Sequence, residues 1–191
     1  MLDLGKRKLI LASASPRRKE LLAGLDLPFK QRLIESDEDY PDSIDLKDVA
    51  RYLAHKKSEA YMQGLADDEI IITCDTTVLK DDILLNKPEN SVDAKKMLEL
   101  LSGNTHKVIT GVCIRSTKKE ICFESISTVI FSQLDASEID YYINKYKPYD
   151  KAGSYGIQEW IGYIGIEKIE GSYYNIMGMP VHRIYEELKQ F

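Results

Sequence analysis

Near the N-terminus, a short apolar run passes directly into the start of a helix. Residues 9–12 are Leu-Ile-Leu-Ala, which predicts a buried strand, and Ser-Ala-Ser-Pro-Arg-Arg follows at 13–18. Proline is favoured at the first helical position, and a serine just before it can cap the free N–H groups. The segment therefore predicts a strand, a turn and a helix over residues 16–23.

This helix start is also a candidate anion site. Unpaired N–H groups and the helix dipole attract negative charge, and Arg17 and Arg18 add planar guanidinium groups suited to phosphate oxygens. Ser13 and Ser15 lie in the same turn. A phosphate or carboxylate pocket is one interpretation. A capped helix with two solvated arginines is the other.

The rest of the chain alternates between strand and helix patterns. Strands are expected at 29–34 and 69–74, a hairpin at 78–85, and consecutive strands at 108–114, 121–123 and 125–133. Helices are expected at 45–62, 91–101 and 137–147, and after Pro180. This order predicts an α/β protein, with a mixed twisted sheet and flanking helices. We expect a single domain over 1–191, with a smaller lobe around 108–150 and a ligand cleft between the lobes.

Composition excludes several classes of protein. A chain of 191 residues with a net charge of −5 can bury one core, but it lacks the broad basic surface of a nucleic-acid binder. Neither a signal peptide nor a membrane span is apparent, so we expect a cytoplasmic protein without a membrane partner. The cysteines at 74, 113 and 122 lack metal-site spacing and are odd in number, which predicts neither a disulfide framework nor a zinc site.

Several polar residues could carry chemistry. Asp75 follows a buried strand, where it could serve as a general base or metal ligand, although aspartate is equally common in turns. Lys87, held extended before a proline, could reach a phosphate or remain solvated. The acidic loop with Glu35 and Glu38 could hold Mg²⁺ with a nucleotide, or form a solvated surface.

A glycine-rich segment covers residues 150–158, Asp-Lys-Ala-Gly-Ser-Tyr-Gly-Ile-Gln. Its glycines allow the backbone to approach a ligand, and the Gln158 amide offers the donor and acceptor that a nucleobase edge requires. An ordinary loop is the alternative. No phosphate-binding Walker loop, dinucleotide fingerprint or serine-hydrolase elbow is present in the sequence.

In order and spacing, seven motifs resemble those of the Maf family of nucleoside triphosphate pyrophosphatases, once named for septum formation. They are Ser-Ala-Ser-Pro-Arg-Arg at 13–18, Asp-Thr at 75–76, Asn-Lys-Pro at 86–88, Leu-Ser-Gly-Asn-Thr-His at 101–106, the segment 150–158, and Gly-Ser-Tyr at 171–173 with Gly-Met-Pro at 178–180. The similarity extends over nearly the whole chain. Each motif is weak alone, and the set is specific.

The resemblance implies a two-lobed fold like that of inosine triphosphate pyrophosphatases, with the active site in the cleft between the lobes. It implies hydrolysis of a nucleoside triphosphate to the monophosphate and pyrophosphate with Mg²⁺, or with Mn²⁺ or Co²⁺ in its place. The family's catalytic positions fall on Asp75, Lys57, Lys87 and Arg17. Its metal-binding positions fall on Asp75 and Glu38. Lys56 lies beside Lys57, so the sequence leaves open which of these two lysines faces the site.

The implied substrate-binding positions are Ser13, Ser15, Arg18, Thr76, Lys151 and Gln158. Among these, Arg18, Thr76 and Gln158 resemble the branch that hydrolyses dTTP and UTP, with modified pyrimidine nucleotides as further substrates. The alternatives are a 7-methyl-GTP pyrophosphatase of the same family, a nucleotidyltransferase or sugar-phosphate enzyme, and a non-enzymatic nucleotide-binding regulator of cell division. A homodimer is compatible with such an enzyme, although no segment specifies an interface.

Overall fold

The computed structural model describes residues 2–33 and 37–191, and the chain divides into two compact units. The first unit contains Met1–Asp75, Thr110–Ser125 and Gly178–Phe191, and the second contains Thr76–Ile109 and Ile126–Met177. The smaller lobe expected around 108–150 stays a prediction. The single domain over 1–191 and the cleft between lobes stay predictions.

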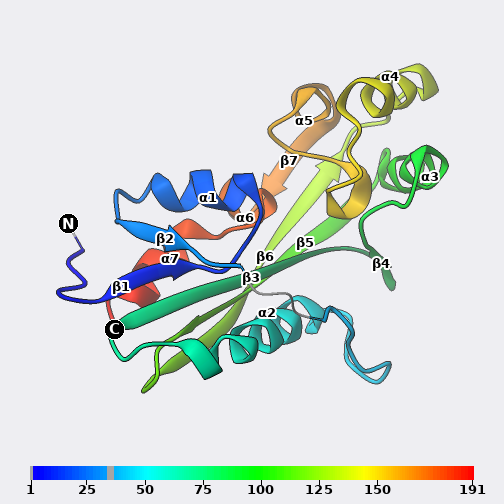
Figure 1. Cartoon of the computed structure of the whole chain (residues 1–191). Coiled ribbons are helices and arrows are strands. Elements are labelled where there is room, and N and C mark those ends of the chain that lie inside the picture. Colours follow the sequence, from blue (N-terminus) through cyan, green and yellow to red (C-terminus); the bar gives the residue numbers. More distant parts are fainter. Residues whose placement is uncertain (1, 34–36) are drawn as a thin grey trace. The chain divides into compact units, whose positions relative to one another are not determined.

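Parallel strands form the centre of the first unit. Strand β1 (Lys8–Leu11) pairs in parallel with β2 (Phe29–Gln31) on one side and with β3 (Glu69–Lys80) on the other, with Ile10 opposite Ile71. Leu9, Ile10 and Leu11 are all buried, because both faces of a parallel sheet are covered. In Figure 1, helix α1 (Pro16–Ala23) lies on one side of β1 and β3, and helix α2 (Val49–Ala60) lies on the other.

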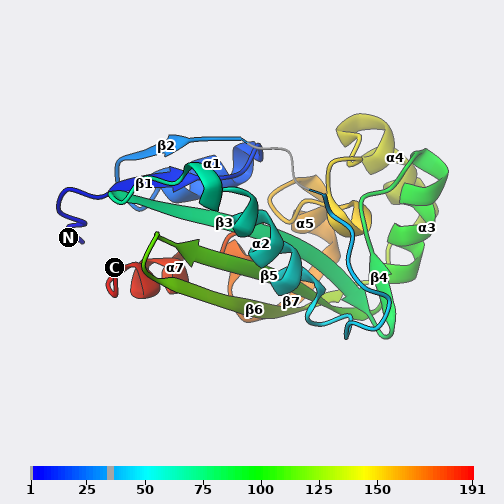
Figure 2. The ribbon, with the colours of Figure 1, turned by 60° about the horizontal axis from the view of Figure 1, so that its bottom comes forward.

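Helix α2 lies close against the sheet of this unit, as Figure 2 shows. The contact depends on Gly111 of strand β5 (Thr105–Arg115), where an added Cβ would meet the Ala50 carbonyl oxygen at 2.1 Å. The first part of strand β6 (Glu120–Phe131), the short helix η1 (Met62–Gly64) and helix α7 (Val181–Leu188) complete the unit. Only glycine permits so close an approach of helix backbone to strand.

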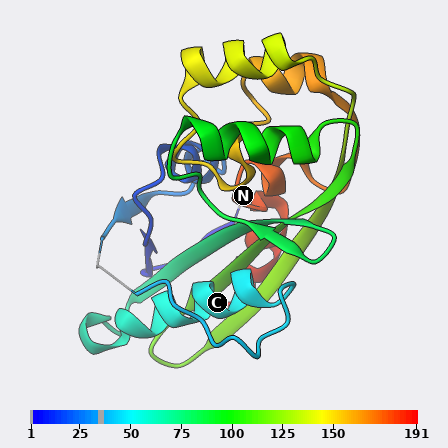
Figure 3. The ribbon, with the colours of Figure 1, turned by 90° about the vertical axis from the view of Figure 1, so that its right-hand side faces the viewer.

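The second unit has its own core. Helices α3 (Ser91–Leu101) and α4 (Ala136–Tyr146) pack together, and Figure 3 shows them side by side. Strand β6 pairs antiparallel with β7 (Ile166–Glu170), and β3 pairs antiparallel with β4 (Ile83–Leu85). The remaining elements are η2 (Ala152–Ser154), α5 (Trp160–Gly165) and α6 (Tyr173–Ile176). Buried side chains of α3, α4, β5 and β6 fill the core.

The expected fold class is confirmed: the structure is α/β, with a seven-stranded mixed sheet and flanking helices. The strand order is β2-β1-β3-β5-β6-β7, with β4 on β3. Among the described residues, no helix combines the length and apolarity needed to cross a membrane.

Some expected boundaries are wrong. Strand β3 does not end at residue 74 but continues to Lys80, and β6 is one strand rather than two, because strand pairing extends past the polar residues that suggested breaks. Helix α2 begins at Val49 rather than near Asp45. The glycine-rich region after residue 153 contains α5, β7 and α6.

The expectation of no disulfide is also wrong. Cys113 of β5 and Cys122 of β6 form a disulfide, with their Cα atoms 4.1 Å apart. Spacing along the chain could not reveal this pair, since the two cysteines meet only through the alignment of the strands. Cys74 is a free thiol buried in the core. Burial raises the pKa of this thiol to about 11.

Candidate active site

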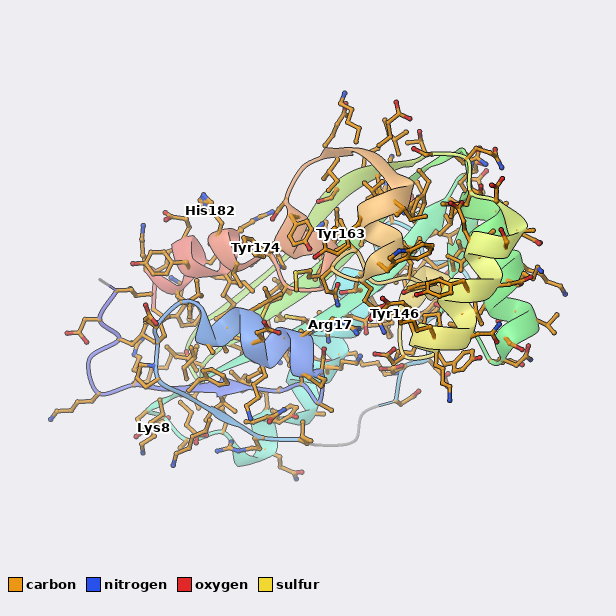
Figure 4. The ribbon with its side chains drawn as sticks, turned by 90° about the horizontal axis from the view of Figure 1, so that it is seen from above. Lys8, Arg17, Tyr146, Tyr163, Tyr174 and His182 are labelled. Carbon is orange, nitrogen blue, oxygen red and sulfur yellow. A yellow bond between two sulfur atoms is a disulfide. The ribbon has the colours of Figure 1, made fainter. Side chains whose placement is uncertain are left out.

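The start of α1 has the capped geometry that the sequence predicts. Pro16 occupies the first turn, and the Ser15 hydroxyl accepts a hydrogen bond from the Arg18 N–H at 3.5 Å. The Ser13 hydroxyl accepts from the Ser15 N–H at 3.2 Å. Figure 4 labels Arg17 at this end of α1, where its side chain is half-buried. The two serines thus shape the turn that presents the arginines.

Arg18 ties this turn to other parts of the first unit. Its Nε donates to the Gly178 carbonyl at 2.9 Å, and its Nη1 donates to the Cys74 carbonyl at 2.8 Å. The same Nη1 lies 3.4 Å from the Ser13 hydroxyl. Because Cys74 directly precedes Asp75, Arg18 holds the main chain next to the candidate catalytic acid. A nucleobase contact by Arg18 stays a prediction.

Lys57 lies between two carboxylates in the same unit. Its Nζ is 2.6 Å from Asp75 Oδ1 and 2.7 Å from Glu38 Oε1. The side chains of Lys57 and Asp75 are 14% and 13% exposed, whereas Glu38 is 58% exposed. Although burial lowers the pKa of Lys57, the charges and hydrogen bonds of Asp75 and Glu38 more than offset it, so this pKa is raised. Lys57 therefore carries a positive charge at neutral pH.

The neighbouring lysine, Lys56, has different partners. Lys56 Nζ lies 2.9 Å from Asp37 Oδ2 and 2.8 Å from the Asp39 carbonyl oxygen. Both contacts lie in the acidic loop and away from the Asp75 carboxylate. The lysine that contacts Asp75 is therefore Lys57.

Buried polar contacts fix α2 and so determine where Lys57 lies. The Thr73 hydroxyl, two residues before Asp75, donates to the Ala54 carbonyl of α2 at 2.6 Å. The Ser58 hydroxyl lies 3.4 Å from the Cys113 sulfur on β5. These contacts anchor the second half of α2 to strands β3 and β5.

Donor chemistry at this cluster suits a hard cation. Asp75 and Glu38 direct two carboxylate oxygens at one positive centre, the Lys57 ammonium, and carboxylate oxygens are the ligands that Mg²⁺ takes together with phosphates. Among the described residues, three side chains lie close enough together to bind a metal ion: Cys113, Glu120 and Cys122. The two cysteine sulfurs are bonded to each other in a disulfide. Glu35 lies outside the described residues.

The remaining predicted residues belong to the second unit. Lys87 is exposed after β4, and the carbonyl of its neighbour Asn86 accepts a hydrogen bond from the Gly153 N–H at 3.2 Å. The 86–88 motif and the glycine-rich loop are therefore linked. Gln158 is half-buried at the end of that loop, and Thr76 is half-buried on β3.

Lys151 is buried and paired with two carboxylates. Its side chain is 9% exposed, and its Nζ lies 2.7 Å from Asp150 Oδ1 and 3.1 Å from Glu159 Oε1. No local sequence pattern marks Glu159 as a functional residue. Its role depends on the fold of the loop, which returns to Lys151 eight residues later.

Comparison with known proteins places the chain in a family. The family model described as Maf-like protein matches residues 8–191. A protein of Parabacteroides distasonis named dTTP/UTP pyrophosphatase is 54% identical over 99% of this chain and 98% of its own length. Proteins with the same name from Porphyromonas gingivalis and Phocaeicola vulgatus are 52% and 50% identical, over 100% and 98% of this chain and 98% of each relative.

A solved structure from Mycobacterium abscessus, a nucleoside-triphosphatase or dITP/XTP pyrophosphatase, is 12% identical with a TM-score of 0.38. It covers 66% of this chain and 74% of its own, and a TM-score this low supports no inference. The family match over 8–191 and the relatives that match along their full length agree with the order of the motifs. The chain belongs to the Maf family.

Proposed function

We propose that this protein hydrolyses dTTP and UTP to the monophosphate and pyrophosphate, with modified pyrimidine nucleotides as further substrates. The observation that carries the proposal is the pairing of the half-buried Asp75 carboxylate with the Lys57 ammonium and Glu38. Relatives at 50–54% identity that carry the name dTTP/UTP pyrophosphatase support the substrate.

In this mechanism Asp75 acts as the general base. Cleavage between the α- and β-phosphates requires a water molecule in line with the leaving pyrophosphate, and a carboxylate can take the proton of that water as it attacks. Arg18 supports this role through its hydrogen bond to the Cys74 carbonyl, which orients the adjacent main chain. Holding a catalytic group in place in this way lowers the barrier without a further chemical step.

Cationic side chains balance the charge that develops on the phosphates. We assign this role to Lys57 and Arg17 in the first unit and to Lys87 in the second. Fixed positive groups of this kind are often worth about 3 kcal/mol each in the transition state. Ser13 and Ser15 shape the turn at the start of α1, and Arg18, Thr76, Lys151 and Gln158 are the proposed determinants of nucleotide binding.

Asp75 and Glu38 would hold a divalent cation. Mg²⁺ is the proposed ion, with Mn²⁺ or Co²⁺ as substitutes, and when bound it lowers the pKa of water and neutralises phosphate charge. The two carboxylates already share one positive partner, which supports their assignment as ligands. A homodimer and a cytoplasmic location stay predictions.

The test is pyrophosphate release with Mg²⁺ from dTTP, UTP, CTP, ATP, GTP and 7-methyl-GTP. Asp75→Asn keeps the shape of the side chain and removes its charge, so turnover of dTTP and UTP should fall by about 10²–10⁴-fold. Asp82→Asn, in the exposed turn between β3 and β4, is the matched control and should retain wild-type turnover.

Each other outcome has a distinct meaning. Preferential turnover of 7-methyl-GTP would keep the reaction and overturn the substrate assigned through Arg18, Thr76 and Gln158. Nucleotide binding without turnover would replace the enzyme with a regulator. Wild-type turnover in Asp75→Asn would show that another group acts as the base.

A further inference from the structure

A carboxylate in the second unit takes no part in this mechanism, and yet both of its oxygens contact buried polar side chains. Glu159 directly follows Gln158 and occupies the N-cap position of α5. Its side chain is 20% exposed. One oxygen accepts a hydrogen bond from the Tyr142 hydroxyl of α4, and the other lies 3.1 Å from Lys151 Nζ.

Both partners of Glu159 connect back to the glycine-rich loop. Lys151 begins the loop, and the Tyr142 hydroxyl accepts a hydrogen bond from the Gly156 N–H at 3.0 Å. Packing here is close, since a Cβ on Gly156 would lie 2.9 Å from the Glu159 carboxyl carbon and 3.0 Å from Lys151 Cε. One carboxylate thereby ties the start and the middle of the loop to α4.

Charge and burial explain why these contacts are directional. A buried ammonium is costly unless it is paired, and Glu159 is the buried partner of Lys151, whereas Asp150 is 61% exposed. Burial, with the hydrogen bond and charge of Glu159, raises the pKa of the Tyr142 hydroxyl. The hydroxyl keeps its proton, so it donates to Glu159 and accepts from Gly156.

A second anchor on the same loop is independent of Glu159. The hydroxyl of Tyr155 lies 2.8 Å from His106 Nε2 on β5, and both side chains are buried. The loop is therefore held at Tyr155 from one strand, and at Lys151 and Gly156 through Glu159 and Tyr142. Gln158 lies between these anchors and the start of α5.

We propose that Glu159 is a positioning residue for the nucleotide-binding loop, and that it acts through Lys151 and Tyr142 to set the direction of the Gln158 amide. This inference rests on the proposed function, in which Gln158 contacts the base. It also changes the role of Lys151, whose ammonium holds the loop and does not reach the phosphates. Glu159 itself touches no substrate.

Kinetics of Glu159→Gln test this role, with Glu167→Gln on exposed β7 as the matched control. A loop that binds the base but takes no part in bond cleavage affects binding, so the KM for dTTP should rise about tenfold while kcat stays within about twofold. Tyr142→Phe should raise KM in the same direction. The two changes together should raise it by less than the product of their separate effects, because they remove one network.

Inorganic tripolyphosphate separates loop positioning from direct phosphate binding. It has phosphates and no base, so its inhibition constant should be the same in wild type and Glu159→Gln. An inhibition constant that rises with the KM for dTTP would overturn the proposal, since it would place Lys151 on the phosphates. An unchanged KM for dTTP in Glu159→Gln would overturn it as well.

The single tryptophan, Trp160, gives a readout that does not depend on activity. It directly follows Glu159, so acrylamide quenching of its fluorescence reports on the end of the loop. Quenching should increase in Glu159→Gln and not in Glu167→Gln. If the wild-type protein hydrolyses no nucleotide, the proposed function fails, while unchanged quenching in Glu159→Gln would by itself refute the positioning role.

Discussion

Acid should destabilise this protein through one buried histidine. His106 is 2% exposed, and its ring stacks on Phe131 with centroids 5.5 Å apart. Its Nε2 pairs with the Tyr155 hydroxyl, and its Nδ1 has no hydrogen-bond partner within the described part of the chain. Burial, with a smaller contribution from the charge of Lys80, lowers the pKa of His106 from 6.5 to about 4.

The size and direction of the effect follow from proton binding. Between pH 6.5 and about 4 the unfolded chain holds a proton at His106 that the folded chain excludes, so the free energy of unfolding falls as the pH falls. Above pH 6.5 this loss is absent, and below about pH 4 it grows no further because the folded ring also protonates. At about 1.4 kcal/mol per pH unit, the total loss is about 3 kcal/mol.

Urea unfolding at several pH values between 7 and 4 measures this loss. His106→Gln removes the titrating ring, so its free energy of unfolding should lose about 3 kcal/mol less than that of the wild type over this range. His182→Gln changes an exposed histidine on α7, labelled in Figure 4, and should follow the wild type. Parallel losses in the wild type and His106→Gln would refute the reasoning.

Two further substitutions test the packing of each unit. Gly111→Ala places a methyl group 2.1 Å from the Ala50 carbonyl oxygen, a backbone atom that cannot rotate away. The free energy of unfolding, measured by urea titration, should therefore fall by about 3 kcal/mol or more. A loss below about 1 kcal/mol would mean that α2 can move off the sheet. Ser127→Ala removes a buried hydroxyl that accepts from the Ser172 N–H and from Asn175 Nδ2, both at 2.9–3.0 Å. Stability should fall by about 2 kcal/mol, because a buried donor loses its partner, and amide exchange at Ser172 should speed up; unchanged exchange there would contradict this account.

Local patterns were sufficient for much of the fold. The cap at Ser15, the proline that follows it and the apolar run before it are properties of neighbouring residues, and they predicted the start of α1 correctly. Hydrophobic periodicity likewise predicted the α/β class. It failed at the ends of β3 and β6, because a strand continues wherever its neighbours supply hydrogen bonds, and that depends on pairing rather than on the strand itself.

The order of the motifs was also enough to predict the family. The three-dimensional structure was not needed for that conclusion. Tertiary structure decided the partners of the long polar side chains. Arg18 reaches a carbonyl 160 residues away, Lys57 rather than Lys56 meets Asp75, and Lys151 turns to Glu159. Sequence patterns report which side of an element faces the core. The end of a flexible side chain finds its partner only after distant segments have packed, and burial then makes an unpaired charge too costly to keep.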